Sequence, residues 1–214
     1  MIQLFNVTKY IKDRCLLDCV NIKINKGDFV VITGPSGEGK TTLLNIMGFL
    51  DDEFTGSILF NGVKISADIK NDYFEIRKKI GYVFQNSLVN DSQSVYRNMT
   101  LPSLIIPVPE VNERVRYLLK KTGLSGFENK NANILSGGEK QRLSIARAII
   151  HSPVLMLADE PTASLDHDNK IRVIKLLESI NAEYNLTVIV VTHDLDYFKD
   201  KRKIILKNGI LYED

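Results

Sequence analysis

The sequence predicts an α/β fold with a mainly parallel sheet covered by helices, an antiparallel β subdomain and an inserted α-helical subdomain. Three observations support this fold class. Short apolar runs typical of buried strands alternate with helical segments along the 214-residue chain. Near the N-terminus, apolar residues alternate with polar ones at the period of half-buried strands. Residues 92–123 differ, since prolines interrupt them and helical periodicity appears at Val111–Lys121.

The individual elements follow from these patterns. Strands are predicted at Met1–Val7, Val20–Ile24, Phe29–Ile32, Gly56–Phe60, Ile80–Phe84, Val154–Ala158, Thr187–Val191 and Lys203–Leu206. Helices are predicted at Lys40–Met47, Val111–Lys121, Ser136–Ile150, about Asp168–Glu183 and about Leu195–Lys199. Asn61-Gly62 predicts a hairpin turn. We expect one domain over residues 1–214, with the helical subdomain at about 86–152 inside it.

Composition and charge exclude several function classes. The chain has 28 lysines and arginines against 26 aspartates and glutamates, so its net charge of +2 gives no electrostatic reason to expect a nucleic-acid partner. No secretory leader is expected, and no apolar run approaches the ~20 residues that span a bilayer. Action on a membrane would therefore need a separate membrane partner. Cys15 and Cys19 match no common zinc or redox spacing, so we expect reduced, partly buried thiols.

A glycine-rich segment between a buried strand and a helix predicts a phosphate-binding loop. Residues 34–41 fit G-x-x-x-x-G-K-[ST] in the strand–loop–helix context that this motif requires. Glycines let successive backbone N–H groups point at phosphate oxygens, and the helix N-terminus adds positive potential. We expect Lys40 to reach the β- and γ-phosphates and the Thr41 hydroxyl to ligate Mg²⁺. The predicted ATP cradle is Gly34, Pro35, Ser36, Gly37, Gly39, Lys40, Thr41 and Thr42.

Two adjacent carboxylates follow the apolar strand predicted at Val154–Ala158. Asp159 is placed to hold Mg²⁺, directly or through water. Glu160 is placed to polarise the attacking water as a general base. The alternative is a strand that ends at a solvated acidic turn, and the phosphate loop in the same chain favours the metal and base roles.

A second anion site is predicted where Leu135-Ser136-Gly137-Gly138-Glu139 opens a helix. Ser136 and Glu139 have the spacing of a capping box. The two glycines leave the first turn bare, so its N–H groups and positive dipole end face whatever approaches. Because one chain already has a phosphate cradle, this second site is explained if it serves a nucleotide held by another copy of the protein.

These motifs, in this order and over nearly the whole chain, resemble the ATP-binding subunit of ABC-type ATPases, whose signature is the Leu-Ser-Gly-Gly-Glu run. The resemblance implies that Tyr10 stacks on adenine and that Gln85 senses Mg²⁺ and contacts a membrane partner. It also implies that Asp166 lies in a loop crossing a dimer interface and that His193 holds the γ-phosphate. Tyr10 as a plain strand aromatic and Gln85 as a surface residue are the alternatives.

A closer resemblance, to ATPases of lipoprotein release, macrolide export and bacteriocin export, rests on Leu43–Asp51 and on Asn98 followed by Leu101-Pro102. Glu38 departs from this subgroup, which usually has a small residue there. Its carboxylate must point away from the triphosphate or weaken binding. Residues 90–96 also lack the subgroup's usual Leu-Pro pattern, near the expected contact with the partner.

The resemblance implies an ATPase that powers an ABC transporter, in which two copies form a homodimer around ATP and Mg²⁺. Catalysis is assigned to Glu160, His193 and Lys40, the metal to Thr41, Gln85 and Asp159, and the partner's half-site to Ser136, Gly137 and Gly138. The implied partner is an integral-membrane permease at the cytoplasmic face of the cell membrane, exporting peptide, lipoprotein or drug-like cargo. The alternative is the ATPase of a non-transporting membrane complex that controls cell-wall remodelling. No heptads connect the phosphate loop to the signature, which disfavours DNA-repair members.

Overall fold

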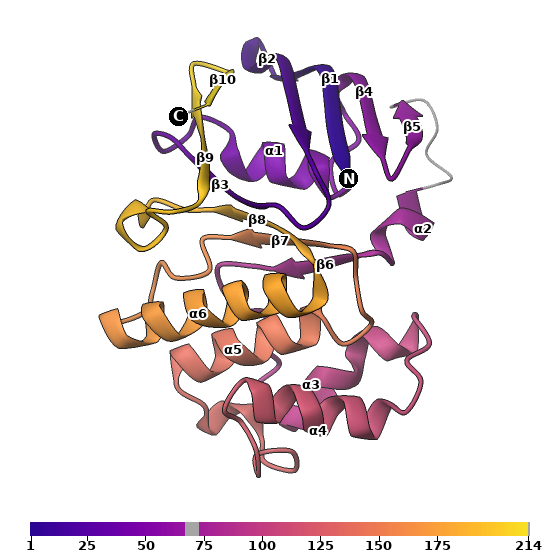
Figure 1. The fold of residues 1–214 in the computed structure, drawn as a ribbon, viewed down its shortest axis with the longest axis vertical. Coiled ribbons are helices and arrows are strands. Elements are labelled where there is room, and N and C mark those ends of the chain that lie inside the picture. Colours follow the sequence, from indigo (N-terminus) through magenta and orange to yellow (C-terminus); the bar gives the residue numbers. More distant parts are fainter. Residues whose placement is uncertain (67–72, 214) are drawn as a thin grey trace.

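The computed structural model describes residues 1–66 and 73–213 and arranges them in two sheets with helices around them (Figure 1). The larger sheet has the strand order β10-β9-β3-β8-β7-β6. Its strands are β3 (Phe29–Thr33), β6 (Ile80–Val83), β7 (Leu155–Asp159), β8 (Thr187–Val191), β9 (Arg202–Lys207) and β10 (Ile210–Glu213). Neighbouring strands pair in parallel, except that β10 pairs antiparallel with β9.

The smaller sheet is antiparallel and has the order β2-β1-β4-β5. Its strands are β1 (Ile2–Ile11), β2 (Arg14–Ile24), β4 (Thr55–Phe60) and β5 (Val63–Ser66). At the tip of the β1–β2 hairpin, Tyr10 pairs with Cys15 and Ile11 pairs with Arg14. This tip carries residues that line the site described below.

The helices cover both faces of the larger sheet. They are α1 (Lys40–Met47), α2 (Tyr73–Arg77), α3 (Val95–Thr100), α4 (Val111–Lys121), α5 (Gly137–Ala148) and α6 (His167–Tyr184), with 3₁₀ turns η2 (Leu101–Leu104), η3 (Ala132–Ile134) and η4 (Leu195–Tyr197). Helix α1 lies between the two sheets, and α5 and α6 lie on the other face, with α3 and α4 beyond them (Figure 1). Within the described ranges, every helix is too short or too polar to cross a membrane.

Two apolar cores explain why the central strands are apolar throughout. Val30 and Ile32 of β3 pack in the core that includes α1, whereas Val31 packs with α5 and α6. Successive side chains of a strand point to opposite faces. A strand that is covered on both faces therefore buries every side chain and is apolar at every position. This burial fixes the strand ends from which the candidate site is built.

The predicted fold class is confirmed, and α1, α4 and β8 have the predicted bounds. The elements of residues 86–152 are helical, while the subdomain boundaries stay a prediction. Strand β10 was missed, although Asn208-Gly209 is a hairpin signal of the kind recognised at Asn61-Gly62. The helix predicted at about Leu195–Lys199 is only the 3₁₀ turn η4. The expectation for Cys15 and Cys19 was wrong in part: both are free thiols, but both are exposed.

Candidate nucleotide site

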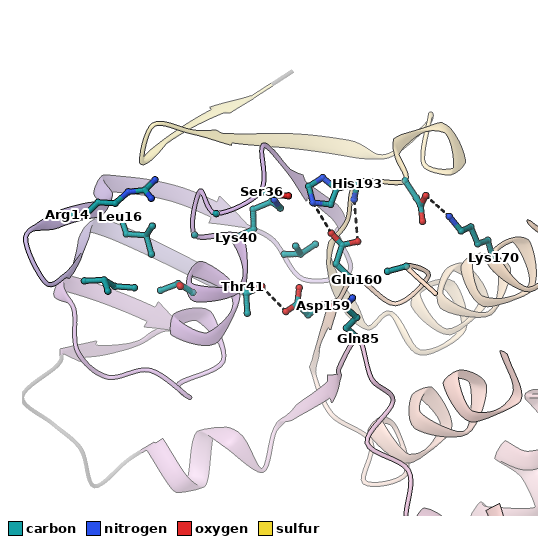
Figure 2. Close-up of a pocket in the computed structure, with 17 residues that line it drawn as sticks. Arg14, Leu16, Ser36, Lys40, Thr41, Gln85, Asp159, Glu160, Lys170 and His193 are labelled. Carbon is teal, nitrogen blue, oxygen red and sulfur yellow. Dashed lines mark hydrogen bonds and ion pairs between the residues drawn. The ribbon is translucent and has the colours of Figure 1, made fainter. Parts of the chain in front are cut away.

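Three neighbouring parallel strands bring the predicted site residues to one edge of the larger sheet. β3 leads into the glycine-rich loop, β7 ends at Asp159, and His193 follows β8, which lies between them. The loops that leave these carboxyl ends line a cavity of about 710 Å³ (Figure 2). Of the predicted site residues, the cavity brings together Ser36, Gly37, Gly39, Lys40, Thr41, Thr42, Gln85, Asp159, Glu160 and His193.

The glycine-rich loop curls because glycines occupy positions that other residues cannot. Gly34 has φ of 147°, and a Cβ there would lie 2.0 Å from the carbonyl oxygen of Leu206. Gly39 precedes α1 with φ of 97°, in the left-handed region that favours glycine. The Lys40 ammonium donates hydrogen bonds of 2.8 Å to the carbonyl oxygens of Gly34 and Pro35, which closes the loop on itself.

The Glu38 carboxylate points away from the cavity, which is the first of the two alternatives expected from the sequence. It accepts a hydrogen bond from the backbone N–H of Asn208, in the β9–β10 turn. The guanidinium of Arg14 lies 4.0 Å from its other oxygen. Glu38 therefore ties the phosphate loop to the neighbouring hairpin and does not line the cavity.

Asp159 and Thr41 form a side-chain pair that fits a Mg²⁺ ion. The Thr41 hydroxyl donates a hydrogen bond of 2.8 Å to Asp159 Oδ2. The other oxygen, Oδ1, is buried and has no hydrogen-bond partner in the described part of the chain. Burial raises the pKa of Asp159 against the hydrogen bond from Thr41 and the charge of Lys40. A divalent cation would satisfy this oxygen, and Mg²⁺ typically uses one or two carboxylates with water and phosphate as its remaining ligands.

Glu160 and His193 face each other at the mouth of the cavity (Figure 2). His193 Nε2 lies 3.3 Å from Glu160 Oε1, and the His193 backbone N–H lies 3.4 Å from Oε2. Glu160 has φ of 46°, a left-handed conformation that is uncommon for a residue with a side chain, and its N–H donates to the Val191 carbonyl. The backbone therefore holds this carboxylate beside the imidazole in an arrangement suited to activating water.

The β1–β2 hairpin supplies the far end of the cavity. Ile11, Arg14 and Leu16 line the cavity, whereas Tyr10 does not. Adjacent strand residues point to opposite faces, so the side chain of Tyr10 lies with that of its partner Cys15 on the other side of the hairpin. The aromatic ring predicted to stack on adenine is thus turned away from the cavity, and Tyr10 is 61% exposed.

The signature helix α5 begins with the predicted capping box. The Glu139 N–H donates to Ser136 Oγ at 3.3 Å, and Glu139 Oε2 accepts 2.8 Å hydrogen bonds from the Ser136 N–H and hydroxyl. These bonds lower the pKa of Glu139. Ser136 and Gly137 are exposed, and neither lines the cavity of their own chain. The start of α5 therefore faces outward.

Gly138 is closed to a side chain within the monomer, unlike Gly137. A Cβ on Gly138 would lie 2.5 Å from Asn169, whose Oδ1 accepts a 3.2 Å hydrogen bond from Arg142. A Cβ on Gly137 would meet nothing within 4 Å among the described residues. Asn169 also donates to Asp166, the N-cap of α6, at 2.7 Å.

Replacing Gly138 with alanine is expected to lower the free energy of unfolding by about 1–3 kcal/mol, because Asn169 must move and its hydrogen bonds weaken. Gly137→Ala is the matched control and should leave stability unchanged or raise it, since alanine favours helix. Urea unfolding of both variants measures the difference. Equal stabilities would contradict the assigned packing, and Asn169→Ala should reduce the effect of Gly138→Ala.

Not every predicted residue lies in the cavity. Those outside its lining are Tyr10, Gly34, Pro35, Ser136, Gly137, Gly138 and Asp166. Sequence reasoning in turn missed Arg14, Leu16, Lys170 and Asp194, which line it. Asp194 was one residue from the predicted His193, whereas no motif pointed to Lys170.

Comparison with protein families gives one match that covers most of the chain. The model of the family described as ABC transporter matches residues 17–163. The lipoprotein-releasing system ATP-binding protein LolD of Buchnera aphidicola subsp. Schizaphis graminum is 40% identical, and the alignment covers 100% of this chain and 97% of that protein. The macrolide export ATP-binding/permease protein MacB of Bdellovibrio bacteriovorus is 37% identical over 93% of this chain, but only 31% of MacB is covered.

Other similar proteins bear on direction and assembly. The methionine import ATP-binding protein MetN 2 of Bacillus cereus is 35% identical over 91% of this chain and 59% of its own length. Among solved structures, the ATP-binding cassette MJ0796, described as a dimer in a post-hydrolysis state bound to ADP and phosphate, has a TM-score of 0.87 and 37% identity. That match covers 100% of this chain and 98% of the cassette.

Proposed function

This chain belongs to the ABC transporter family and is its ATP-hydrolysing component, and from that premise we propose that it works as a homodimer with ATP and Mg²⁺ held between two copies. The observation that carries the proposal is the outward-facing start of α5, which does not line the cavity of its own chain. A phosphate loop in one copy and a bare helix start in the other are complementary to the same triphosphate. The dimer described for the similar cassette MJ0796 supports this assembly.

In the proposed site, the chain's own residues divide the work. The ammonium of Lys40 binds the β- and γ-phosphates, and Thr41 and Asp159 hold Mg²⁺ with Gln85 beside them. Mg²⁺, when bound, neutralises phosphate charge. Glu160 takes a proton from the attacking water, while His193 orients the γ-phosphate against it. Asp166, the N-cap of α6, is proposed to lie in the loop that meets the partner copy. It is bonded to Asn169, which in turn contacts α5.

The base of the nucleotide is proposed to lie against Ile11 and the Arg14 guanidinium, which can stack on a base, and not against Tyr10. Tyr10→Ala should therefore change the dissociation constant for ATP by less than about twofold, whereas Arg14→Ala should raise it by about tenfold. Fluorescent-nucleotide titration measures both. A larger loss from Tyr10→Ala than from Arg14→Ala would restore the original assignment of Tyr10.

A separate groove is proposed to bind the membrane subunit at the cytoplasmic face of the membrane. About 570 Å³ in volume, it is lined by apolar side chains from α2, β6 and η2 together with Arg77, Lys78, Arg147 and His151. Its lining contains no aspartate or glutamate among the described residues. Leu104 and Ile105, 79% and 62% exposed, extend the apolar surface beside it. These properties suit an amphipathic helix that carries an acidic residue.

Ile105→Glu is expected to reduce co-purification of the membrane subunit by about tenfold or more, because a carboxylate replaces an apolar contact and competes with the partner's acidic residue for the basic side chains of the groove. ATP affinity of the isolated subunit should not change. Val63→Glu is the matched control, since Val63 is 57% exposed on the other sheet. Equal co-purification of both variants would contradict the assigned groove.

For direction and cargo, we propose export or release of lipoprotein, peptide or drug-like molecules. Support comes from the similarity to LolD and MacB, whose identities of 40% and 37% exceed the 35% of the methionine importer. Reconstitution with the membrane subunit in lipid vesicles, followed by ATP-dependent transport of labelled cargo from each side, tests the direction. Uptake towards the ATPase side would overturn this part of the proposal.

A further inference from the structure

The start of α6 carries a lysine that helix electrostatics disfavours. Lys170 lies in the first turns of α6, where the positive dipole end favours acidic residues. Its side chain is only 19% exposed and lines the nucleotide cavity, with the ammonium directed at a neighbouring carboxylate (Figure 2). Nothing in the motifs of the sequence requires a cation here, so the residue calls for a local explanation.

The explanation is an ion pair with Asp194. The Lys170 ammonium lies 2.7 Å from Asp194 Oδ1, and the Thr162 hydroxyl donates a 2.7 Å hydrogen bond to the other oxygen, Oδ2. The Asp194 N–H donates to Thr192 Oγ1 at 3.1 Å. Burial alone would raise the pKa of Asp194, but the bonds from Lys170 and Thr162 outweigh it and the pKa lies below its usual value. The carboxylate thus joins α6, the loop after β7 and the loop after β8.

Asp194 is bonded through the backbone to His193, which faces Glu160 at 3.3 Å. Fixing the Asp194 side chain therefore fixes the turn from which the imidazole projects. The neighbour of Lys170 on α6, Asn169, packs on Gly138 and accepts from Arg142 of α5. The same helix turn therefore contacts both Asp194, the chain neighbour of His193, and the start of α5.

We propose that Lys170 is a positioning residue that, through Asp194, holds His193 in register with Glu160 and links this site to the signature helix. The inference rests on the proposed function, since it takes His193 and Glu160 as the hydrolytic pair. Lys170 acts on the protein and not on the phosphate. Its loss should therefore slow hydrolysis without weakening ATP binding.

The test compares steady-state ATPase kinetics of Lys170→Met, Lys170→Arg and Asp194→Asn. We expect Lys170→Met to lower kcat by about tenfold or more with KM for ATP nearly unchanged, since small misplacements of reacting groups are costly. Lys170→Arg should restore most of kcat because it keeps the ion pair. The double variant Lys170→Met/Asp194→Asn should be no worse than its worse parent, as coupling through one contact requires.

Lys201→Met is the matched control, because Lys201 forms a 2.9 Å ion pair with Glu178 elsewhere on α6. Lys201→Met should leave kcat unchanged. This control separates the effect of losing an ion pair on α6 from the effect of displacing His193. A wild-type kcat for Lys170→Met would overturn the inference, as would a raised KM at unchanged kcat, which would mean direct contact with the nucleotide. If wild type hydrolyses ATP and Glu160→Gln forms an ATP-dependent dimer, the proposed function stands whichever result is obtained.

Discussion

Replacing Glu160 with glutamine is expected to trap the protein as an ATP-bound dimer that barely turns over. Glutamine keeps the size and the hydrogen-bonding reach of the side chain but cannot accept the proton of the attacking water. Loss of a general base costs about 10²–10⁴-fold in rate. Steady-state ATPase assays measure the loss, and size-exclusion chromatography with light scattering in ATP and Mg²⁺ measures the dimer.

The structure supplies a specific reason to expect a stable trapped state. Glu160 is set by its own backbone, with φ of 46° and its N–H bonded to Val191, so an isosteric change should leave its position intact. Chelating Mg²⁺ should dissolve the dimer, because Thr41 and Asp159 then lose the ion they are placed to hold. Hydrolysis by Glu160→Gln at the wild-type rate would show that another group activates the water.

Replacing Gly137 with aspartate is expected to abolish ATP-driven dimers while leaving the fold intact. A Cβ on Gly137 would meet nothing within 4 Å in the part of the chain that the structure describes, and an acidic residue in the first turn of a helix is favourable by about 0.3–1 kcal/mol. In the proposed dimer, the added carboxylate would lie beside the triphosphate bound by the partner copy. Charge repulsion and bulk then oppose closure of the dimer.

Two measurements separate this effect from damage to the protein. The melting temperature should not fall, and the affinity of the monomer for fluorescent ATP should equal that of wild type, since the cavity of the same chain is not touched. Gly137→Asn adds similar bulk without charge and should weaken the dimer less. Normal ATP-driven dimers of Gly137→Asp in the Glu160→Gln background would contradict the assignment of this half-site.

Much of the fold could be predicted because buried positions carry apolar residues, and their spacing in the sequence indicates strands and helices. The strands around Val31 and Val190 are covered on both faces, so they are apolar throughout and have sharp ends. The hairpin to β10 was missed because its strand, exposed along most of its length, lacks an apolar run, although Asn208-Gly209 signals the turn. The spacing of apolar residues therefore reveals buried strands and helices, but it is a weak signal for exposed strands at the edge of a sheet.

Contiguous motifs in the sequence indicate which residues line the cavity, but they do so less well where the lining depends on strand register. Tyr10 and Ile11 are neighbours in sequence, but the hairpin pairing decides which of them faces the cavity, and one residue reverses the answer. The sequence did not indicate Lys170 as a site residue, because its contact is with Asp194. The order of β7 and β8 in the sheet brings Asp194 beside it. Contacts of this kind exist only after the chain has folded.

Mixing two inactive variants tests the shared site most directly. Lys40→Ala disables the phosphate loop and Gly137→Asp blocks the signature half-site, so neither variant alone can build a complete site. In a mixed dimer, one site carries both changes and the other carries neither. An equal mixture should recover up to about half of the wild-type ATPase rate, because neither variant is expected to dimerise with itself in ATP and each mixed dimer has one intact site of two.

Wild type diluted with excess Lys40→Ala provides the reference, since its mixed dimers also contain one intact site and report what a single site can do. If that reference is active, Lys40→Ala and Gly137→Asp together should hydrolyse ATP although neither does alone. ATPase activity that never exceeds the sum of the two variants, at any ratio, would contradict the claim that each ATP is held between two copies of the protein.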